Sequence, residues 1–337
     1  MDKSNELKPD ANKIYRECIA LVSKINGATE CVNINQKDAG VWNNIVLEVI
    51  TGDKLYFFKK YRKLTKITNY LPPNISSKWR AKVAIFAQSE ASRSFIDEYK
   101  LVPKILVKNN TSFVMEGIPN ERPLLYFLSK GQCPESVTTV FPRALARFHN
   151  NTLGRKHFPD IFLDLTFRDY KLNLQYNNMS TLLSVEHGQI LVDFVNEYKQ
   201  RLLCMVHGDL NSKNVLIGDG DRVYVIDFEQ SHIGSPSYDL AFILSEIFIA
   251  SIQYKNSPSL KDACRLFTEN YFNVFQEDAL TYAKEATMHL ATQIIYRFYG
   301  PSHLVWTSYV NSDQRTEILK FAESLVSCNP KPINVLF

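Results

Sequence analysis

The spacing of apolar and polar residues changes twice along the first third of the chain. Residues 13–26 carry apolar positions at helical spacing and end in Asn-Gly, which predicts a helix and its stop. Residues 30–61 instead hold short runs rich in β-branched and aromatic residues, CVNINQ, NNIVLEVI and KLYFFKKY, with turn residues between them. A further helix is expected at about 80–99, followed by the short strands KILVKN and SFVMEG. Residues 30–118 therefore predict a small, mostly antiparallel sheet with one helix inserted.

The pattern beyond Pro119 is helical almost throughout, and one stretch interrupts it. VHGDLNSKNVLIGDGDRVYVIDFE, residues 206–229, contains two apolar runs around Gly-Asp-Gly-Asp, a strong signal for a β-hairpin. The change of pattern at Gly-Ile-Pro-Asn predicts a boundary between a first lobe, residues 1–118, and a second lobe, residues 119–337. A chain of 337 residues is long enough for two lobes around a cleft.

Three polar side chains are expected to converge at the mouth of this hairpin. Asn214 begins one strand, Asp227 ends the other, and Asp209 lies on the loop just before them. Oxygen donors at adjacent strand ends suit Mg²⁺, which is commonly held by one or two carboxylates together with substrate phosphates. A carboxylate on the nearby loop can face a hydroxyl group and orient it or accept its proton. Phosphoryl transfer needs this division of labour, because positioning and charge neutralisation provide most of its catalysis.

The same stretch and its continuation resemble a known enzyme family. HGDLNSKN at residues 207–214 and IDFE at residues 226–229 resemble the HGDxxxxN and IDxE motifs of the aminoglycoside phosphotransferase and choline kinase superfamily. GSPSYDLA, at residues 234–241, is similar to the G-x-P-x-YDLA segment of that superfamily. Its members are small-molecule kinases with a protein-kinase-like fold. The resemblance implies an α+β fold of two lobes, in which a small antiparallel-sheet lobe binds the nucleotide and a larger, mostly helical lobe carries catalysis and acceptor binding.

The resemblance also implies roles for residues of the second lobe. Asp209 would be the catalytic aspartate, and Asn214 and Asp227 would be metal ligands. His207 would then support the loop and would not act as the general base. Asp239 begins an apolar helical run, where it is expected to cap the helix and to brace the catalytic loop.

A cradle for the nucleotide phosphates is expected in the first lobe. Gly40 and Asn43, in GVWNN, resemble the short G-x-x-N phosphate loop of the family, and an ordinary hairpin turn is the alternative reading of these residues. The family has a phosphate-binding lysine in the strand that corresponds to LYFFKKY. Strand alternation places Lys59 and Lys60 on opposite faces and favours Lys59 for the cleft, with Lys60 as the alternative.

The resemblance further implies that this lysine pairs with a glutamate of the following helix. Glu90 is expected to be this glutamate, and Glu98 is its rival. SFVMEGIPN resembles the linker between the lobes, where Glu116 and Ile118 would offer backbone groups to adenine. The cofactors implied are therefore ATP and Mg²⁺, and the glycine-poor phosphate loop leaves GTP open as the nucleotide.

The acceptor implied is a hydroxyl group of a small molecule, such as an aminoglycoside, choline or a sugar. In the family it binds to helices of the second lobe, which here correspond to about 155–200 and 255–337. Acidic residues in the first of these segments favour, slightly, a cationic or polyhydroxylated acceptor; they are Asp160, Asp164, Asp169 and Glu186. Basic residues in the same segments leave an anionic acceptor open; they are Lys171, Lys199, Arg201 and Arg297.

Two other functions compete with an active small-molecule kinase. Glu229 stands where protein kinases have glycine and no APE motif follows, which disfavours a protein substrate. A nucleotide-binding pseudoenzyme or regulatory protein without turnover is the main alternative. The presence of Asp209, Asn214 and Asp227 together favours turnover, because a pseudoenzyme does not need all three.

Composition bears on partners and compartment. Lys and Arg number 39 against 35 for Asp and Glu, an excess too small and too dispersed to predict nucleic-acid binding. Six cysteines are scattered without a CxxC pair, which is typical of reduced thiols in the cytoplasm. No apolar run reaches the length of a membrane span, and the first residues lack the apolar core of a signal peptide. We therefore expect a cytoplasmic protein without membrane or nucleic-acid partners; the pattern gives no indication of its oligomeric state.

Overall fold

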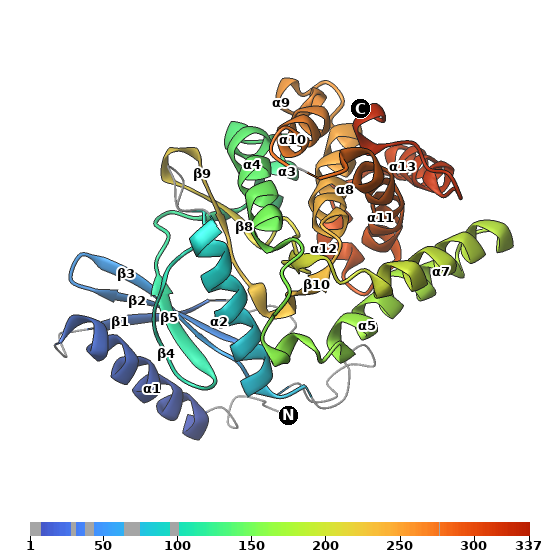
Figure 1. Cartoon of the computed structure of the whole chain (residues 1–337). Helices are drawn as coiled ribbons and strands as arrows, with labels where there is room; N and C mark the ends of the chain where they lie inside the picture. The colour runs from blue at the N-terminus through green and yellow to red at the C-terminus, as the bar shows by residue number, and fades with distance from the viewer. Residues whose placement is uncertain (1–7, 28–31, 38–43, 64–74, 95–100, 276) are drawn as a thin grey trace, which may run out of the picture.

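The computed structural model has two parts around a central junction, a sheet with two helices and a larger helical part (Figure 1). It describes residues 8–27, 32–37, 44–63, 75–94, 101–275 and 277–337. The expected fold class, an α+β fold with a small antiparallel sheet and a larger, mostly helical part, is confirmed by this architecture. Within the described residues, no helix combines the length and the apolar character that a membrane span requires.

Five antiparallel strands form the sheet of the first part, in the order β1-β2-β3-β5-β4. Their bounds are β1 Val32–Lys37, β2 Ile45–Thr51, β3 Lys54–Lys60, β4 Ile105–Lys108 and β5 Ser112–Glu116. Gly52 turns β2 into β3 with a φ of 59°, a backbone conformation that suits glycine, so the turn residues between these two runs form a hairpin. Side chains alternate along β3, and this alternation decides which residues face the second part.

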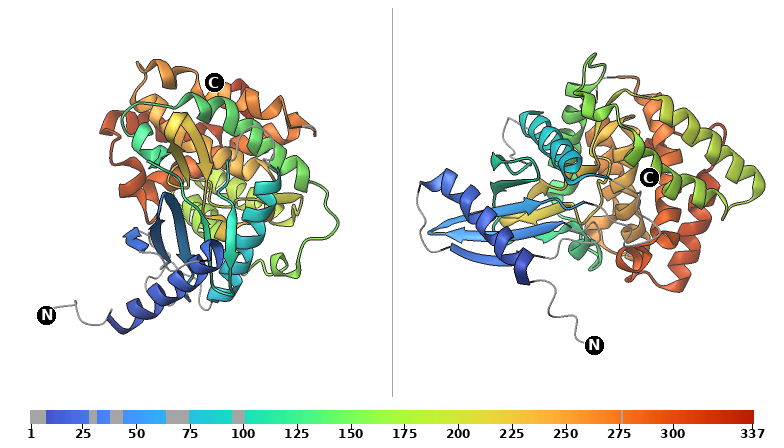
Figure 2. Two further views of the ribbon diagram at one scale, coloured as in Figure 1. Left: turned by 90° about the vertical axis from the view of Figure 1, so that its left-hand side faces the viewer. Right: turned by 90° about the horizontal axis from the view of Figure 1, so that it is seen from below.

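One helix covers each face of this sheet. α1, Lys8–Asn26, lies across the outer face and packs Ile14, Cys18 and Leu21 against Tyr56 and Phe58 of β3 (Figure 2). α2, Ser77–Ser94, lies between the sheet and the helical part (Figure 1). Most of its buried residues are alanines and short aliphatic side chains, which allow close approach to both parts.

The second part contains most of the helices. The first of them are α3 Leu124–Leu128, α4 Glu135–Thr152, α5 Thr166–Leu172, α6 Asn178–Ser180 and α7 Val185–Gln200. The later ones are α8 Ser237–Gln253, α9 Pro258–Lys261, α10 Ala263–Phe272, α11 Ala279–Tyr299, α12 His303–Thr307 and α13 Ser312–Leu325. α8 is buried over most of its length and packs against α11, so these two helices form the centre of the largest hydrophobic core.

Short strands at the junction hold the segment with the sequence motifs. β8 Val215–Gly218 and β9 Arg222–Val225 form the predicted hairpin, and β6 Arg122–Pro123 pairs with its outer edge. The sequence pattern missed a second pair, β7 Cys204–Val206 with β10 His232–Gly234. Because His232 lies opposite Val206, this pair brings the chain before Asp209 next to the chain after Asp227.

Candidate active site

Hydrogen bonds to α8 hold the loop that carries Asp209. Asp239 accepts hydrogen bonds from the backbone N–H groups of His207, at 2.6 Å, and Gly208, at 3.0 Å. Gly208 has a φ of 77°, and a Cβ there would lie 2.2 Å from the carbonyl oxygen of Gln230. Only glycine fits this position without moving the backbone. The expected brace is therefore present, whereas the expected helix cap is not, because α8 has no capping bond from a side chain.

His207 supports the same loop as a neutral imidazole. Its Nε2 lies 2.9 Å from the carbonyl oxygen of Ile226, and its Nδ1 accepts the backbone N–H of Asp209 at 3.2 Å. A carbonyl can only accept, so Nε2 carries the proton and Nδ1 has none. Burial lowers the pKa of His207, which favours the neutral form of the ring. Both ring nitrogens are engaged, so the histidine connects the loop to the hairpin and is not aimed at a substrate.

Asp209 is surrounded by three hydrogen-bond donors. Its carboxylate accepts from Nζ of Lys171 at 2.7 Å, Nε2 of Gln230 at 3.0 Å and Nδ2 of Asn214 at 3.2 Å. Burial acts to raise the pKa of Asp209, but the charge and hydrogen bond of Lys171 outweigh it and bring the pKa below its usual value. Asp209 is therefore ionised at neutral pH, oriented, and a weak base.

The two expected metal ligands lie side by side. Asn214 and Asp227 are joined through Ile226, whose N–H donates to the carbonyl oxygen of Asn214 at 2.9 Å across the hairpin. Nδ2 of Asn214 donates to the backbone oxygen of Asp209 at 2.9 Å, which leaves its side-chain oxygen to serve as a ligand. Asp227 has a φ of 72°, an uncommon conformation for a residue other than glycine. One carboxylate and one amide oxygen fit the donor set that Mg²⁺ takes.

The structure places the two lysines of β3 on opposite sides of the sheet. Nζ of Lys59 lies 2.5 Å from Oδ1 of Asp227 and 5.1 Å from the centre of the Tyr61 ring, and its side chain is 7% exposed. Lys60 points to the outer face and pairs with Glu17 of α1. Of the two candidates, only Lys59 therefore joins Asp209, Asn214 and Asp227 at the junction.

The expected pair between Lys59 and Glu90 does not form. Glu90 contacts Arg93 on its own helix and Arg155, at 2.8 Å, which lies just after α4. Glu90 follows Arg80 on α2 by ten residues, a rise of about 15 Å, and Arg80 is the residue of α2 that reaches the motif. Glu98, the rival candidate, lies outside the described residues.

Instead, a buried ion pair connects α2 to the motif. Its charges are the reverse of the expected pair, because the helix carries the positive charge. Nη2 of Arg80 lies 2.5 Å from Oε2 of Glu229, and the two side chains are 0% and 1% exposed. Asn44, just before β2, donates to the other oxygen of Glu229 at 3.0 Å. Here the helix provides the cation and the residue after Asp227-Phe228 provides the carboxylate. The sequence showed Glu229 as a departure from protein kinases but gave no sign of its partner.

The chain segment between the two parts runs through Glu116, Gly117 and Ile118. Gly117 donates to the carbonyl oxygen of Leu55 at 2.9 Å, and a Cβ at this position would collide with Leu55. Ile118 is buried and packs in one cluster with Leu216 of β8. Glu116 accepts the backbone N–H of Lys104 at 3.2 Å through its side chain. Gly40 and Asn43, the predicted phosphate-loop residues, lie outside the described residues.

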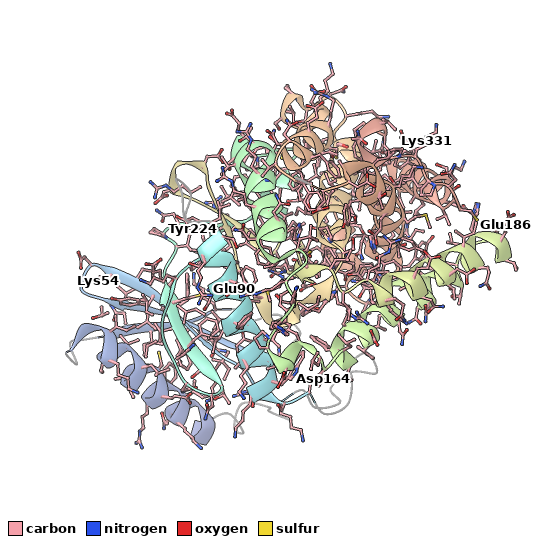
Figure 3. All side chains as sticks on the ribbon, in the orientation of Figure 1. Lys54, Glu90, Asp164, Glu186, Tyr224 and Lys331 are labelled. Atoms are coloured by element: carbon pink, nitrogen blue, oxygen red, sulfur yellow. The ribbon has the colours of Figure 1, made fainter. Side chains whose placement is uncertain are left out.

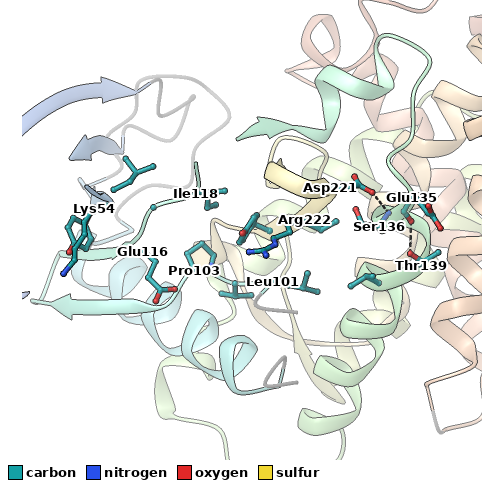
Figure 4. Close-up of a pocket in the computed structure, with 18 residues that line it drawn as sticks. Lys54, Leu101, Pro103, Glu116, Ile118, Glu135, Ser136, Thr139, Asp221 and Arg222 are labelled. Carbon is teal, nitrogen blue, oxygen red and sulfur yellow. Dashed lines mark hydrogen bonds between the residues drawn. The ribbon is translucent and has the colours of Figure 1, made fainter. Parts of the chain in front are cut away.

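A cavity of about 980 Å³ opens beside this segment (Figure 4). It is lined by the start of β3, residues 101–103, residues 116–118, the first turn of α4 and the turn that enters β9. Its lining includes Glu116 and Ile118 but none of Lys59, Asp209, Asn214 and Asp227. The cavity is therefore adjacent to the linker and separate from the catalytic cluster.

Sequence comparison finds a family for the middle of the chain. Residues 112–256 match the model of the phosphotransferase enzyme family. The matched segment begins with β5 and ends after α8, so it contains Asp209, Asn214 and Asp227. Comparison with the sequences of curated proteins found no match.

Solved structures of small-molecule kinases share this fold. A choline kinase from Cryptosporidium parvum Iowa II superposes with a TM-score of 0.59 at 16% identity, over 97% of this chain and 99% of that chain. An ethanolamine kinase from Plasmodium vivax gives a TM-score of 0.54 at 16% identity, over 94% and 89% of the two chains. A choline/ethanolamine kinase family protein from Mesorhizobium loti gives 0.51 at 16% identity, over 92% and 94%.

The family match and the shared fold confirm the resemblance to the aminoglycoside phosphotransferase and choline kinase superfamily. The match to the phosphotransferase enzyme family over residues 112–256 agrees with the class of enzyme that the resemblance implies, which is a kinase. At 16% identity the structural neighbours establish the fold, and the acceptor has to be inferred from the residues around Asp209.

Proposed function

We propose that this chain transfers the γ-phosphate of ATP to a hydroxyl group of a small molecule. The observation that supports it most strongly is the cluster of Lys59, Asp209, Asn214 and Asp227, which draws its members from the sheet, the loop and the hairpin. In the proposed arrangement residues 1–118 bind the nucleotide and residues 119–337 carry catalysis and the acceptor. Positioning and charge neutralisation, which this cluster can provide, supply most of the catalysis of phosphoryl transfer.

In the proposed reaction the acceptor hydroxyl oxygen forms a bond to the γ-phosphorus. The bond from that phosphorus to the β,γ-bridging oxygen breaks, ADP leaves, and the hydroxyl proton is released. Because the pKa of Asp209 is lowered, its carboxylate holds a proton poorly before the transfer. We assign to Asp209 the orientation of the hydroxyl group, with the proton received only as the new bond forms.

The nucleotide is proposed to lie between the sheet and the hairpin. Glu116 and Ile118 would offer backbone groups to adenine, and Gly40 and Asn43 would approach the phosphates from the first part. Lys59 is the described cation nearest to the hairpin ligands, at 2.5 Å from Asp227. Asn214 and Asp227 would hold Mg²⁺, which when bound neutralises charge on the β- and γ-phosphates. Glu90 is removed from this set, since it pairs with arginines elsewhere.

The experiment that tests the proposal measures ATP consumption with a panel of hydroxyl compounds. ADP formation is followed with aminoglycosides, choline, ethanolamine, sugars and polyols, and GTP replaces ATP in a parallel series. The proposal expects one class of acceptor to raise ADP formation by orders of magnitude and to yield a phosphorylated product in the mass spectrum. Nucleotide binding without turnover on any acceptor would favour the pseudoenzyme, and efficient labelling of proteins instead of small molecules would favour a protein kinase.

A further inference from the structure

Lys171 places a positive charge directly on the proposed catalytic aspartate. It lies in the last turn of α5, and its Nζ donates to Oδ1 of Asp209 at 2.7 Å. The same ammonium group donates to Oε1 of Gln230 at 2.7 Å and to the carbonyl oxygen of Gly208 at 2.5 Å. All three protons of the ammonium group are therefore used, and they join α5 to both segments that flank the site. Its side chain is 12% exposed, so the group is largely removed from water.

Two aromatic rings of the second part, those of Phe242 and Trp306, already face cations of the protein. Nζ of Lys171 lies 5.0 Å from the centre of the Phe242 ring, and the guanidinium of Arg297 lies 4.5 Å from the same ring. Arg297 also lies 5.0 Å from the ring of Trp306, which Lys213 approaches at 5.2 Å. A quaternary ammonium ligand is held by rings of this kind at similar distances. Phe242 and Trp306 therefore have protein cations where such a ligand would need them free.

The carboxylates of the region are also paired. Glu246 accepts from Arg297 at 2.8 Å and from the backbone N–H of Ser212 at 3.0 Å. Asp169, one of the acidic residues that favoured a cationic acceptor, pairs with Arg168 at 2.8 Å. The remaining acidic residues of that set are exposed, and Figure 3 places Glu186 at the outer end of α7. Among the described residues, the charged group directly beside the Asp209 carboxylate is thus the ammonium group of Lys171.

We propose that Lys171 positions Asp209 and selects against cationic acceptors. Its ammonium group stands where the positive end of a choline-like alcohol would meet the carboxylate, and like charges in contact cost several kcal/mol. The acceptor is therefore a hydroxyl compound without positive charge beside its reacting hydroxyl, of the sugar or polyol type. This inference rests on the proposed function, and it separates this chain from the choline and ethanolamine kinases whose fold it shares.

The test compares acceptors of different charge on Lys171→Met, which keeps length and removes charge, and on Lys171→Arg, which keeps charge. Lys255→Met, at an exposed lysine that is 3.6 Å from Glu317, is the matched control. Turnover and KM are measured with choline and ethanolamine as cations, glycerol and D-ribose as neutral compounds, and D-glycerate as an anion. Binding of Mg²⁺-ATP to each variant shows that the nucleotide site is intact.

The wild type is expected to turn over neutral or anionic compounds and to reject choline. Lys171→Met should lose turnover on the preferred compound by on the order of 10²-fold through misplacement of Asp209, with unchanged nucleotide affinity. Its KM for choline should fall on the order of 10²-fold, whereas Lys171→Arg and the control should keep the rejection. Choline or ethanolamine as the best wild-type acceptor would overturn this inference and leave the kinase standing. An absence of both nucleotide binding and turnover would contradict the proposed function, and the inference with it.

Discussion

Replacing Arg80 with methionine should destabilise the protein strongly, because it would leave a buried carboxylate without its counter-ion. Arg80 and Glu229 are 0% and 1% exposed, and Nη2 of the arginine lies 2.5 Å from the carboxylate. Removing one partner of such a buried pair costs about 3–5 kcal/mol. Asn44 still donates to Glu229 at 3.0 Å in the variant. This remaining hydrogen bond to a charged group offsets part of the loss, so we expect a cost of about 3 kcal/mol.

A double variant separates the stranded charge from the loss of packing. In Arg80→Met combined with Glu229→Gln, the amide oxygen can still accept from Asn44 and no buried charge is left alone. We expect this double variant to recover more than about 1 kcal/mol relative to Arg80→Met. Lys82→Met, at an exposed position of α2, is the control for replacing a basic side chain of this helix with methionine. Its free energy of unfolding should stay within about 0.5 kcal/mol of wild type.

The assay is urea unfolding at 25 °C, followed by circular dichroism, with the midpoint and slope fitted separately for each protein. An unchanged slope shows that the difference in midpoint reports stability and not a change in the unfolded state. If Arg80→Met lowers the free energy of unfolding by less than about 1 kcal/mol, the reasoning is refuted. It is also refuted if the double variant is no more stable than Arg80→Met, because Glu229 would then not depend on Arg80 for its charge balance.

Two further predictions concern Lys59 and His232. Lys59→Ala should reduce turnover far more than Lys60→Ala, because only Lys59 reaches Asp227; similar, mild losses in a steady-state assay would contradict this. Burial lowers the pKa of His232 to about 3, whereas an unfolded histidine titrates near 6.5. Below pH 6.5 the unfolded chain therefore binds a proton that the folded protein excludes, and stability should fall by about 2 kcal/mol between pH 6.5 and pH 5. His232→Asn should show a smaller fall in urea midpoint over this range, and an equal fall in both proteins would contradict the argument.

The sequence was most informative where neighbours along the chain are also neighbours in space. The hairpin of residues 215–225 follows from its turn and its apolar runs, so the juxtaposition of Asn214 and Asp227 could be predicted before the structure. Strand alternation likewise separated Lys59 from Lys60, because a period of two leaves one choice for each face.

The sequence was least informative where a helix packs across the site. Which residue of α2 faces the motif depends on the position of the helix along its axis relative to the sheet. No local sequence pattern determines this position. Glu90 was therefore expected at a place that Arg80 occupies. Lys171 precedes Asp209 by 38 residues on a separate helix, and its sequence context marks only a surface of mixed charge. The short strands β7 and β10 were missed because three residues are too few to show a period.

Transfer of labelled γ-phosphate from ATP to a small hydroxyl compound, compared between wild type and Asp209→Asn, tests the central claim most directly. The substitution keeps the shape of the side chain and removes the charge that orients the acceptor. We expect the label to appear in the acceptor with the wild type, and transfer by Asp209→Asn to be lower by about 10²–10⁴-fold. Nucleotide affinity should change by no more than about twofold, since Asp209 acts on the acceptor. If Asp209→Asn transfers the label at more than about a tenth of the wild-type rate, Asp209 is not the catalytic aspartate.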